Sequence, residues 1–96
     1  MRLRYTPRAI RHLNSIADFI AQHNPSAAVQ IGARIRTAAA LLERFPAIGR
    51  EGALATTREL IVPGLPYIVV YRVAHDEIAI VGIYHGAQLR PGQSNL

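Results

Sequence analysis

The sequence contains no cysteine and no lysine, and each absence narrows the chemistry that the chain can perform. Without cysteine there is no disulfide bond and no thiolate metal site. No two histidines stand at metal-ligand spacing with a third ligand nearby, so we expect no metal and no cofactor. Without lysine, all 11 basic residues are arginine, and the formal net charge is +5. Planar guanidinium groups bind carboxylate or phosphate groups in bidentate pairs. The excess of positive charge therefore predicts an acidic partner, either a nucleic acid or a protein. The alternative is a surface rich in arginine that has no such partner.

Long apolar runs are also missing. No stretch approaches the roughly 20 apolar residues that a membrane span requires. The first residues, MRLRYTPRAIRHL, carry charges throughout and lack the apolar run of a signal peptide. We therefore expect a soluble protein of the cytoplasm with no membrane partner. A length of 96 residues predicts one domain, residues 1–96.

Two segments in the first half have the periodicity and the start signals of helices. Thr6 is a candidate N-cap and Pro7 suits the first helical position, and Asn24 and Pro25 repeat this pair. Apolar residues then recur at helical spacing after each pair. The predicted helices cover residues 7–22 and 25–44. A connection of two or three residues makes them an antiparallel hairpin.

The second half predicts an antiparallel meander. One short strand-like segment, residues 1–6, precedes the predicted helices. Three more follow them, at residues 57–62, 67–74 and 78–85. The connections PGLP and HDE are turn sequences, so consecutive strands pair in opposite directions. Residues 89–96 are interpreted as a flexible tail. The predicted fold class is α+β: an N-terminal strand and an antiparallel helix hairpin packed on an antiparallel sheet of three to four strands.

In this order of elements the chain resembles the RelE/ParE superfamily of bacterial toxins. Five motifs carry the resemblance, in order: FIAQHNPSAA, LLERFPAIGR, REL, YIVVYRV and IYHGAQ. The resemblance covers nearly the whole chain. It implies a growth-inhibiting toxin of a type II toxin–antitoxin pair, held inactive by its antitoxin. It also implies one of two targets, because RelE-like members cleave mRNA on the ribosome whereas ParE-like members poison DNA gyrase and are not known as enzymes.

The middle strand is apolar on both faces, which is unusual for an antiparallel sheet that is half open to solvent. Tyr67, Val69, Tyr71 and Val73 point one way, and Ile68, Val70, Arg72 and Ala74 point the other way. One set covers the helices and the other faces an open cleft. We predict that an amphipathic antitoxin helix binds the open face at Ile68, Val70 and Arg72, with Arg50 pairing with an acidic antitoxin group. A homodimer or a thicker core is the alternative.

The resemblance also weighs against ribonuclease chemistry. RelE-like members typically carry arginines at the places of Ile68 and Gln88 in this chain, so two cations near the scissile phosphate are missing. Arg58, Arg72 or Arg90 would have to replace them. In that reading His85 moves a proton, because its reference pKa lies near neutrality, Arg58 or Arg72 binds phosphate and Glu51 acts as a base. In the other reading His85 closes the last strand by hydrogen bonding, since ParE-like members also carry HGA there.

Three further features receive structural interpretations. Gly49 is expected to permit a positive φ after the second helix, and Arg50 anchors the loop if it does not bind the antitoxin. His12, His23 and His75 are interpreted as surface or turn residues. The basic cluster formed by Arg2, Arg4, Arg8 and Arg11 lacks a DNA-reading motif, so we expect no direct operator recognition by this chain alone.

The sequence thus predicts a ParE-like toxin that binds DNA gyrase and is neutralised by a cognate antitoxin. The alternatives are a RelE-like, ribosome-dependent mRNA endonuclease acting through His85, and an inactive binding remnant.

Overall fold

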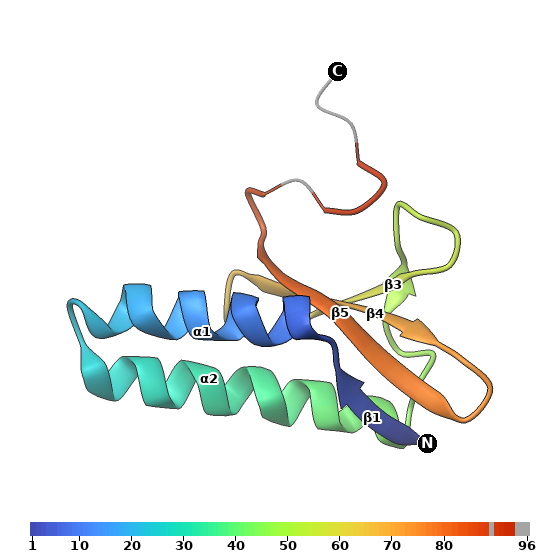
Figure 1. Cartoon of the computed structure of the whole chain (residues 1–96), viewed down its shortest axis with the longest axis horizontal. Coiled ribbons are helices and arrows are strands. Elements are labelled where there is room, and N and C mark those ends of the chain that lie inside the picture. Colours follow the sequence, from blue (N-terminus) through green and yellow to red (C-terminus); the bar gives the residue numbers. More distant parts are fainter. Residues whose placement is uncertain (89, 94–96) are drawn as a thin grey trace.

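The computed structural model describes residues 1–88 and 90–93 and consists of a helix hairpin beside a twisted sheet (Figure 1). The elements are β1 (Arg2–Tyr5), α1 (Pro7–Ala21), α2 (Pro25–Ala40), the 3₁₀ turn η1 (Leu41–Glu43), β2 (Arg50–Glu51), β3 (Arg58–Ile61), β4 (Tyr67–Val73) and β5 (Glu77–His85). Within the described ranges, no helix is long and apolar enough to cross a membrane.

Both predicted helix caps form. The Thr6 hydroxyl accepts a hydrogen bond from the Ala9 N–H at 3.2 Å, and the Asn24 side chain accepts one from the Ala27 N–H at 3.0 Å. Each bond satisfies one of the backbone donors that a helix start leaves free. The helices begin where the sequence predicts, and the 3₁₀ turn carries the second helical segment to residue 43.

The sheet has the strand order β1-β5-β4-β3-β2. The predicted meander of β3, β4 and β5 is antiparallel, and the α+β class is confirmed. Two details of the prediction are wrong. β1 pairs in parallel with β5, so the sheet is mixed, and the long connection that parallel pairing needs includes the helix hairpin and the strands β2 to β4. A fifth strand, β2, pairs with β3 inside the predicted loop, and two residues are too few to show strand periodicity.

One face of the sheet packs against the helices (Figure 1). Val69 and Tyr71 of β4 are fully buried on this face, with Tyr67 partly buried beside them, as the alternation in the sequence predicts. The helices contribute an apolar stripe that includes Ala28, Ile31, Ile35, Ala38 and Leu42, and its members are buried or partly buried.

A bulge in β5 adjusts which side chains reach this core. Val70 pairs with Gly82 whereas Tyr71 pairs with Ile80, so Val81 has no partner in β4. One unpaired residue changes the alternation of side chains along the strand. Ile80 and Ile83 therefore both enter the core although they are three residues apart.

The loop after α2 is held by the hydroxyl of Tyr71. This buried hydroxyl donates to the Pro46 carbonyl at 2.8 Å and accepts from the Gly49 N–H at 2.9 Å. Burial raises the pKa of Tyr71 above its usual value. A Cβ on Gly49 would lie 2.5 Å from the hydroxyl oxygen, so glycine is needed here for space. The predicted positive φ of Gly49 is wrong, because among the described residues positive φ occurs only at Gly64 and Gly92.

We expect Tyr71→Phe to lower the free energy of unfolding by about 1–3 kcal/mol, because it leaves the Gly49 N–H and the Pro46 carbonyl without their partner. Urea unfolding measures this loss. Tyr67→Phe is the matched control, since the Tyr67 hydroxyl makes no hydrogen bond within the described ranges. An equal effect of the two substitutions would show that the Tyr71 hydroxyl does not hold the loop.

Candidate functional site

Three of the four candidate catalytic residues line one hollow. Glu51, Arg58 and Arg72 lie around a depression of about 400 Å³, together with residues 55–57 and the end of β4. The Arg58 guanidinium is already engaged, since it donates to the Gly49 carbonyl at 2.8 Å and to the Ala47 carbonyl at 3.4 Å. Arg58 thus helps Tyr71 to hold the loop before β2. The structure brings these three residues near one another without a mutual hydrogen bond in the described part of the chain.

His85 lies at the other end of the sheet. It pairs with Tyr67, whereas Arg58 pairs with Tyr71, four residues further along β4. A strand rises about 3.3 Å per residue, so His85 and Arg58 are separated by roughly 13 Å along the sheet. The structure does not bring His85 to the hollow that holds the other three candidates.

The Nδ1 atom and the backbone of His85 take part in a turn. The ring atom Nδ1 accepts a hydrogen bond from the backbone N–H of Ala87 at 3.1 Å. The backbone N–H of His85 donates to Oε1 of Gln88 at 2.6 Å. The ring stands edge-on to Tyr67 with 5.8 Å between ring centroids. These contacts are those of a residue that ends β5 and starts a turn.

The second face of the sheet differs from the prediction. Ile68 and Val70 are only 6% and 1% exposed, so the expectation of an open apolar face at these residues is wrong. They form a smaller apolar cluster with Val81, and Tyr84 packs against it. The alternative interpretation, a thicker core, agrees with this burial, because other side chains of the same chain already shield Ile68 and Val70 from solvent. Their predicted contact with an antitoxin stays a prediction.

A buried carboxylate joins three segments on this second face. Glu59 pairs with Val70 across the sheet and is 4% exposed. Its Oε1 accepts from the guanidinium groups of Arg50 and Arg90, each at 3.1 Å. A carboxylate out of water needs such partners, because an unpaired buried charge is strongly destabilising. Arg50 therefore anchors β2 to β3.

The ion pair between Arg90 and Glu59 involves the segment that was predicted to be a flexible tail, residues 89–96. The Arg90 side chain is only 10% exposed and lies against Glu59, so residue 90 packs on the sheet. Leu89 and residues 94–96 lie outside the described residues.

His12 has a role that the sequence did not reveal. Its Nδ1 accepts a hydrogen bond from the Ile83 N–H at 3.1 Å, just beyond the point where β1 stops pairing with β5. Its ring stands edge-on to Tyr84 at 4.9 Å between centroids. Burial, together with the positive charges of Arg8 and Arg11, lowers the pKa of His12 below 6.5. No motif marks such a contact, because it depends on where one strand ends relative to another.

Metal binding has no support in the described geometry. Across residues 1–88 and 90–93, no three histidine, aspartate or glutamate side chains are placed to hold a metal ion.

Comparisons with known proteins place the chain among the toxins of toxin–antitoxin systems. A family model described as "ParE toxin of type II toxin-antitoxin system, parDE" matches residues 3–90. The chain therefore belongs to the ParE toxin family, and the predicted RelE/ParE superfamily is confirmed.

Individual relatives agree with this assignment. The chain is 41% identical over 90 residues to "Putative toxin Y4kP" of Sinorhizobium fredii, covering 94% of this chain and 93% of that protein. It is 44% identical over 85 residues to "Toxin RelE2" of Caulobacter vibrioides, covering 88% and 94%. Among solved structures, a chain of the "Chromosomal ParDE TA system from P. aeruginosa" superposes with a TM-score of 0.82 at 25% identity, covering 88% of this chain and 95% of that chain.

The position of His12 predicts a pH dependence of stability. Because the folded state lowers the pKa of His12, its neutral form contributes stability that is fully present above pH 6.5 and is lost as the pH falls through the lower, folded-state pKa. We expect His12→Asn to reduce this loss on acidification, since asparagine keeps an acceptor for the Ile83 N–H but takes up no proton. Urea unfolding at a series of pH values measures it.

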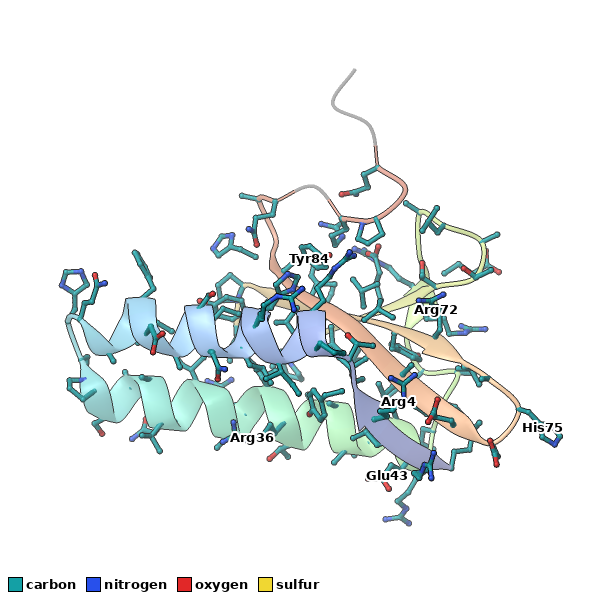
Figure 2. All side chains as sticks on the ribbon, viewed as in Figure 1. Arg4, Arg36, Glu43, Arg72, His75 and Tyr84 are labelled. Carbon is teal, nitrogen blue, oxygen red and sulfur yellow. The ribbon has the colours of Figure 1, made fainter. Side chains whose placement is uncertain are left out.

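His75→Asn is the control for this experiment. His75 is exposed and points away from the molecule at the β4–β5 turn (Figure 2). The His75→Asn substitution should leave the pH dependence of the free energy of unfolding as it is in the parent chain. If the His12 and His75 variants both retain the full acid-dependent loss, another group is responsible.

Proposed function

We propose that this toxin inhibits growth by binding DNA gyrase and that a cognate antitoxin neutralises it by covering part of its sheet. The observation that carries the proposal is the placement of His85. Its Nδ1 accepts a hydrogen bond from the Ala87 N–H, and the candidate phosphate-binding arginines, Arg58 and Arg72, lie at the other end of the sheet. A docking toxin needs a stable surface and no proton-transfer group, and this arrangement is consistent with that requirement.

Two further contacts support binding over catalysis. Ile68, at the place where the resemblance implies a phosphate-binding arginine, is a buried member of the second apolar cluster. Arg58, a candidate to replace that arginine, donates to loop carbonyls. Stabilising an anionic transition state requires preorganised cations directed at the reacting group, and only Arg72 among these candidates lacks a partner in the described part of the chain.

The runner-up is a RelE-like mRNA endonuclease. The hollow between Glu51, Arg58 and Arg72 favours the endonuclease. Two guanidinium groups are able to hold a phosphate, and the carboxylate beside them is able to accept a proton. The two proposals differ in their targets, and growing cells separate them. Induction of the toxin is expected to produce DNA-damage signalling and gyrase-linked breaks before translation falls. Rapid mRNA cleavage within ribosomes, with gyrase unaffected, would overturn the gyrase proposal.

The surface that we propose for the antitoxin is shifted from the one predicted by sequence. Ile68 and Val70 lie beneath it, whereas Ile61, which pairs with Ile68 across the sheet, is 53% exposed. Ile61 and the unpaired Arg72 flank the buried cluster on β3 and β4. An amphipathic antitoxin segment that bridges them would bury the isoleucine and neutralise the arginine.

For His85→Gln we expect growth inhibition to persist, because glutamine supplies an acceptor for the Ala87 N–H while removing a group that titrates near neutrality. A general acid or base typically contributes about 10²–10⁴-fold to rate, so a nuclease that works through His85 would lose its toxicity. The measurement is colony formation after induction, with His75→Gln as the matched control. A folded His85→Gln protein that still binds its antitoxin but no longer inhibits growth would contradict the docking proposal.

For Ile61→Asp we expect folding to be kept and antitoxin affinity to fall by about 10-fold or more, because burying an aliphatic side chain contributes roughly 1.5–3 kcal/mol. Calorimetric titration with the purified antitoxin measures the change. Val73→Asp is the control, since Val73 is also half exposed, at 43%, but extends from the alternate side of β4. Equal affinities of the parent and Ile61→Asp would mean that the antitoxin covers a different surface.

A further inference from the structure

The arginines of this chain fall into groups according to their partners. Four form ion pairs, two with Glu77 and two with Glu59, and Arg34 and Arg58 bond backbone carbonyls. The other five, namely Arg8, Arg11, Arg36, Arg44 and Arg72, make neither an ion pair nor a hydrogen bond in residues 1–88 and 90–93. Figure 2 shows that Arg36 on α2 lies apart from Arg72 on β4.

Three of these five free arginines come together. Arg8 and Arg11 from the first turns of α1 and Arg72 from β4 line a hollow of about 290 Å³, which Thr6, Pro7 and Val81 complete. Arg8 and Arg72 are 64 positions apart in sequence, so the fold itself gathers them. Like charges in a shared concave site repel one another, and the protein's low-dielectric walls strengthen their field.

The neighbouring groups do not neutralise this charge. The Thr6 hydroxyl donates to the Ile80 carbonyl at 2.8 Å and caps α1. The carboxylate of Glu77 accepts from Arg2 and Arg4, which lower its pKa. His12 uses Nδ1 to accept the Ile83 N–H. The positive end of the α1 dipole adds to the field, so the hollow attracts an anion.

We propose that the hollow formed by Arg8, Arg11, Arg72 and Val81 binds the carboxylates of an acidic, partly apolar segment of the antitoxin. Guanidinium groups hold carboxylates in bidentate pairs, and Pro7 and Val81 offer apolar contact beside them. Single-stranded nucleic acid binds by stacking its bases on aromatic rings, and none of the six lining residues is aromatic. The chemistry of the lining therefore favours a peptide over a phosphate backbone. This inference rests on the proposed neutralisation by an antitoxin and extends its contact surface from β4 to α1.

The test uses a short peptide of alternating glutamate and leucine, and its binding to the full chain is followed by fluorescence anisotropy. The variant is Arg8→Gln/Arg72→Gln, and the matched control is Arg36→Gln/Arg44→Gln. Each double substitution lowers the net charge from +5 to +3, since two arginines are removed in both. None of the four arginines forms an ion pair or a hydrogen bond within the described ranges, and the Arg44 guanidinium lies over the Phe45 ring. A charge-assisted hydrogen bond lost at the hollow should weaken binding by about 10-fold or more, whereas the control should change it by about twofold or less.

Each outcome decides between specific binding and its alternatives. Equal losses in both double variants would mean diffuse attraction and would overturn the proposal. So would tighter binding of a single-stranded DNA oligonucleotide of matched charge that depends on the same hollow, because it would assign the site to phosphate. If Arg8→Gln/Arg72→Gln does not fold, Arg11→Gln/Arg72→Gln replaces it. If the peptide fails to bind while the co-expressed antitoxin still restores growth, this inference fails and the proposed neutralisation stands.

Discussion

The position of β5 between β1 and β4 is the constraint on which the rest of this structure depends. β5 pairs in parallel on one side and antiparallel on the other, and the unpaired Val81 lets both Ile80 and Ile83 face the helices. Gly82 follows directly, and a Cβ there would lie 2.5 Å from the Tyr84 ring. Because Tyr84 covers Gly82, the second face closes over its own apolar cluster. The sheet therefore has an apolar cluster on each face.

Charge is arranged around that closed sheet in a consistent way. The buried Glu59 has two arginines as partners, and Glu77 at the start of β5 also has two. The Glu59 pairs join β2 and the segment after β5 to β3, and the more exposed Glu77 pairs join β1 to β5. Three arginines without an ion pair in the described residues, Arg8, Arg11 and Arg72, converge beside α1, where we propose the antitoxin contact.

Local signals in the sequence were sufficient for the two helices, for the three strands of the meander and for the superfamily. The Thr6 and Asn24 caps, the helical stripes and the turns of the meander depend on neighbouring residues, and each was found as predicted. The features that the sequence missed depend on how the strands pair. The parallel β1–β5 pair and the bond from Ile83 to His12 join segments about 70 residues apart, and no periodicity reports them. The bulge at Val81 depends on the register between β5 and β4, which the alternation of side chains along one strand does not reveal. The burial of Ile68 was missed because it depends on Val81 and Tyr84 of the neighbouring strand β5, whose positions beside Ile68 follow from the strand register.

We propose that this toxin acts by docking on gyrase and performs no cleavage of its own. The most direct measurement adds the purified chain to a supercoiling reaction with purified gyrase and, in parallel, to ribosomes translating a defined mRNA. The account predicts that supercoiling stops and cleaved DNA accumulates at stoichiometric toxin, while the mRNA stays intact in a primer-extension assay. Cleavage of the mRNA at the ribosome, with supercoiling unchanged, would contradict it.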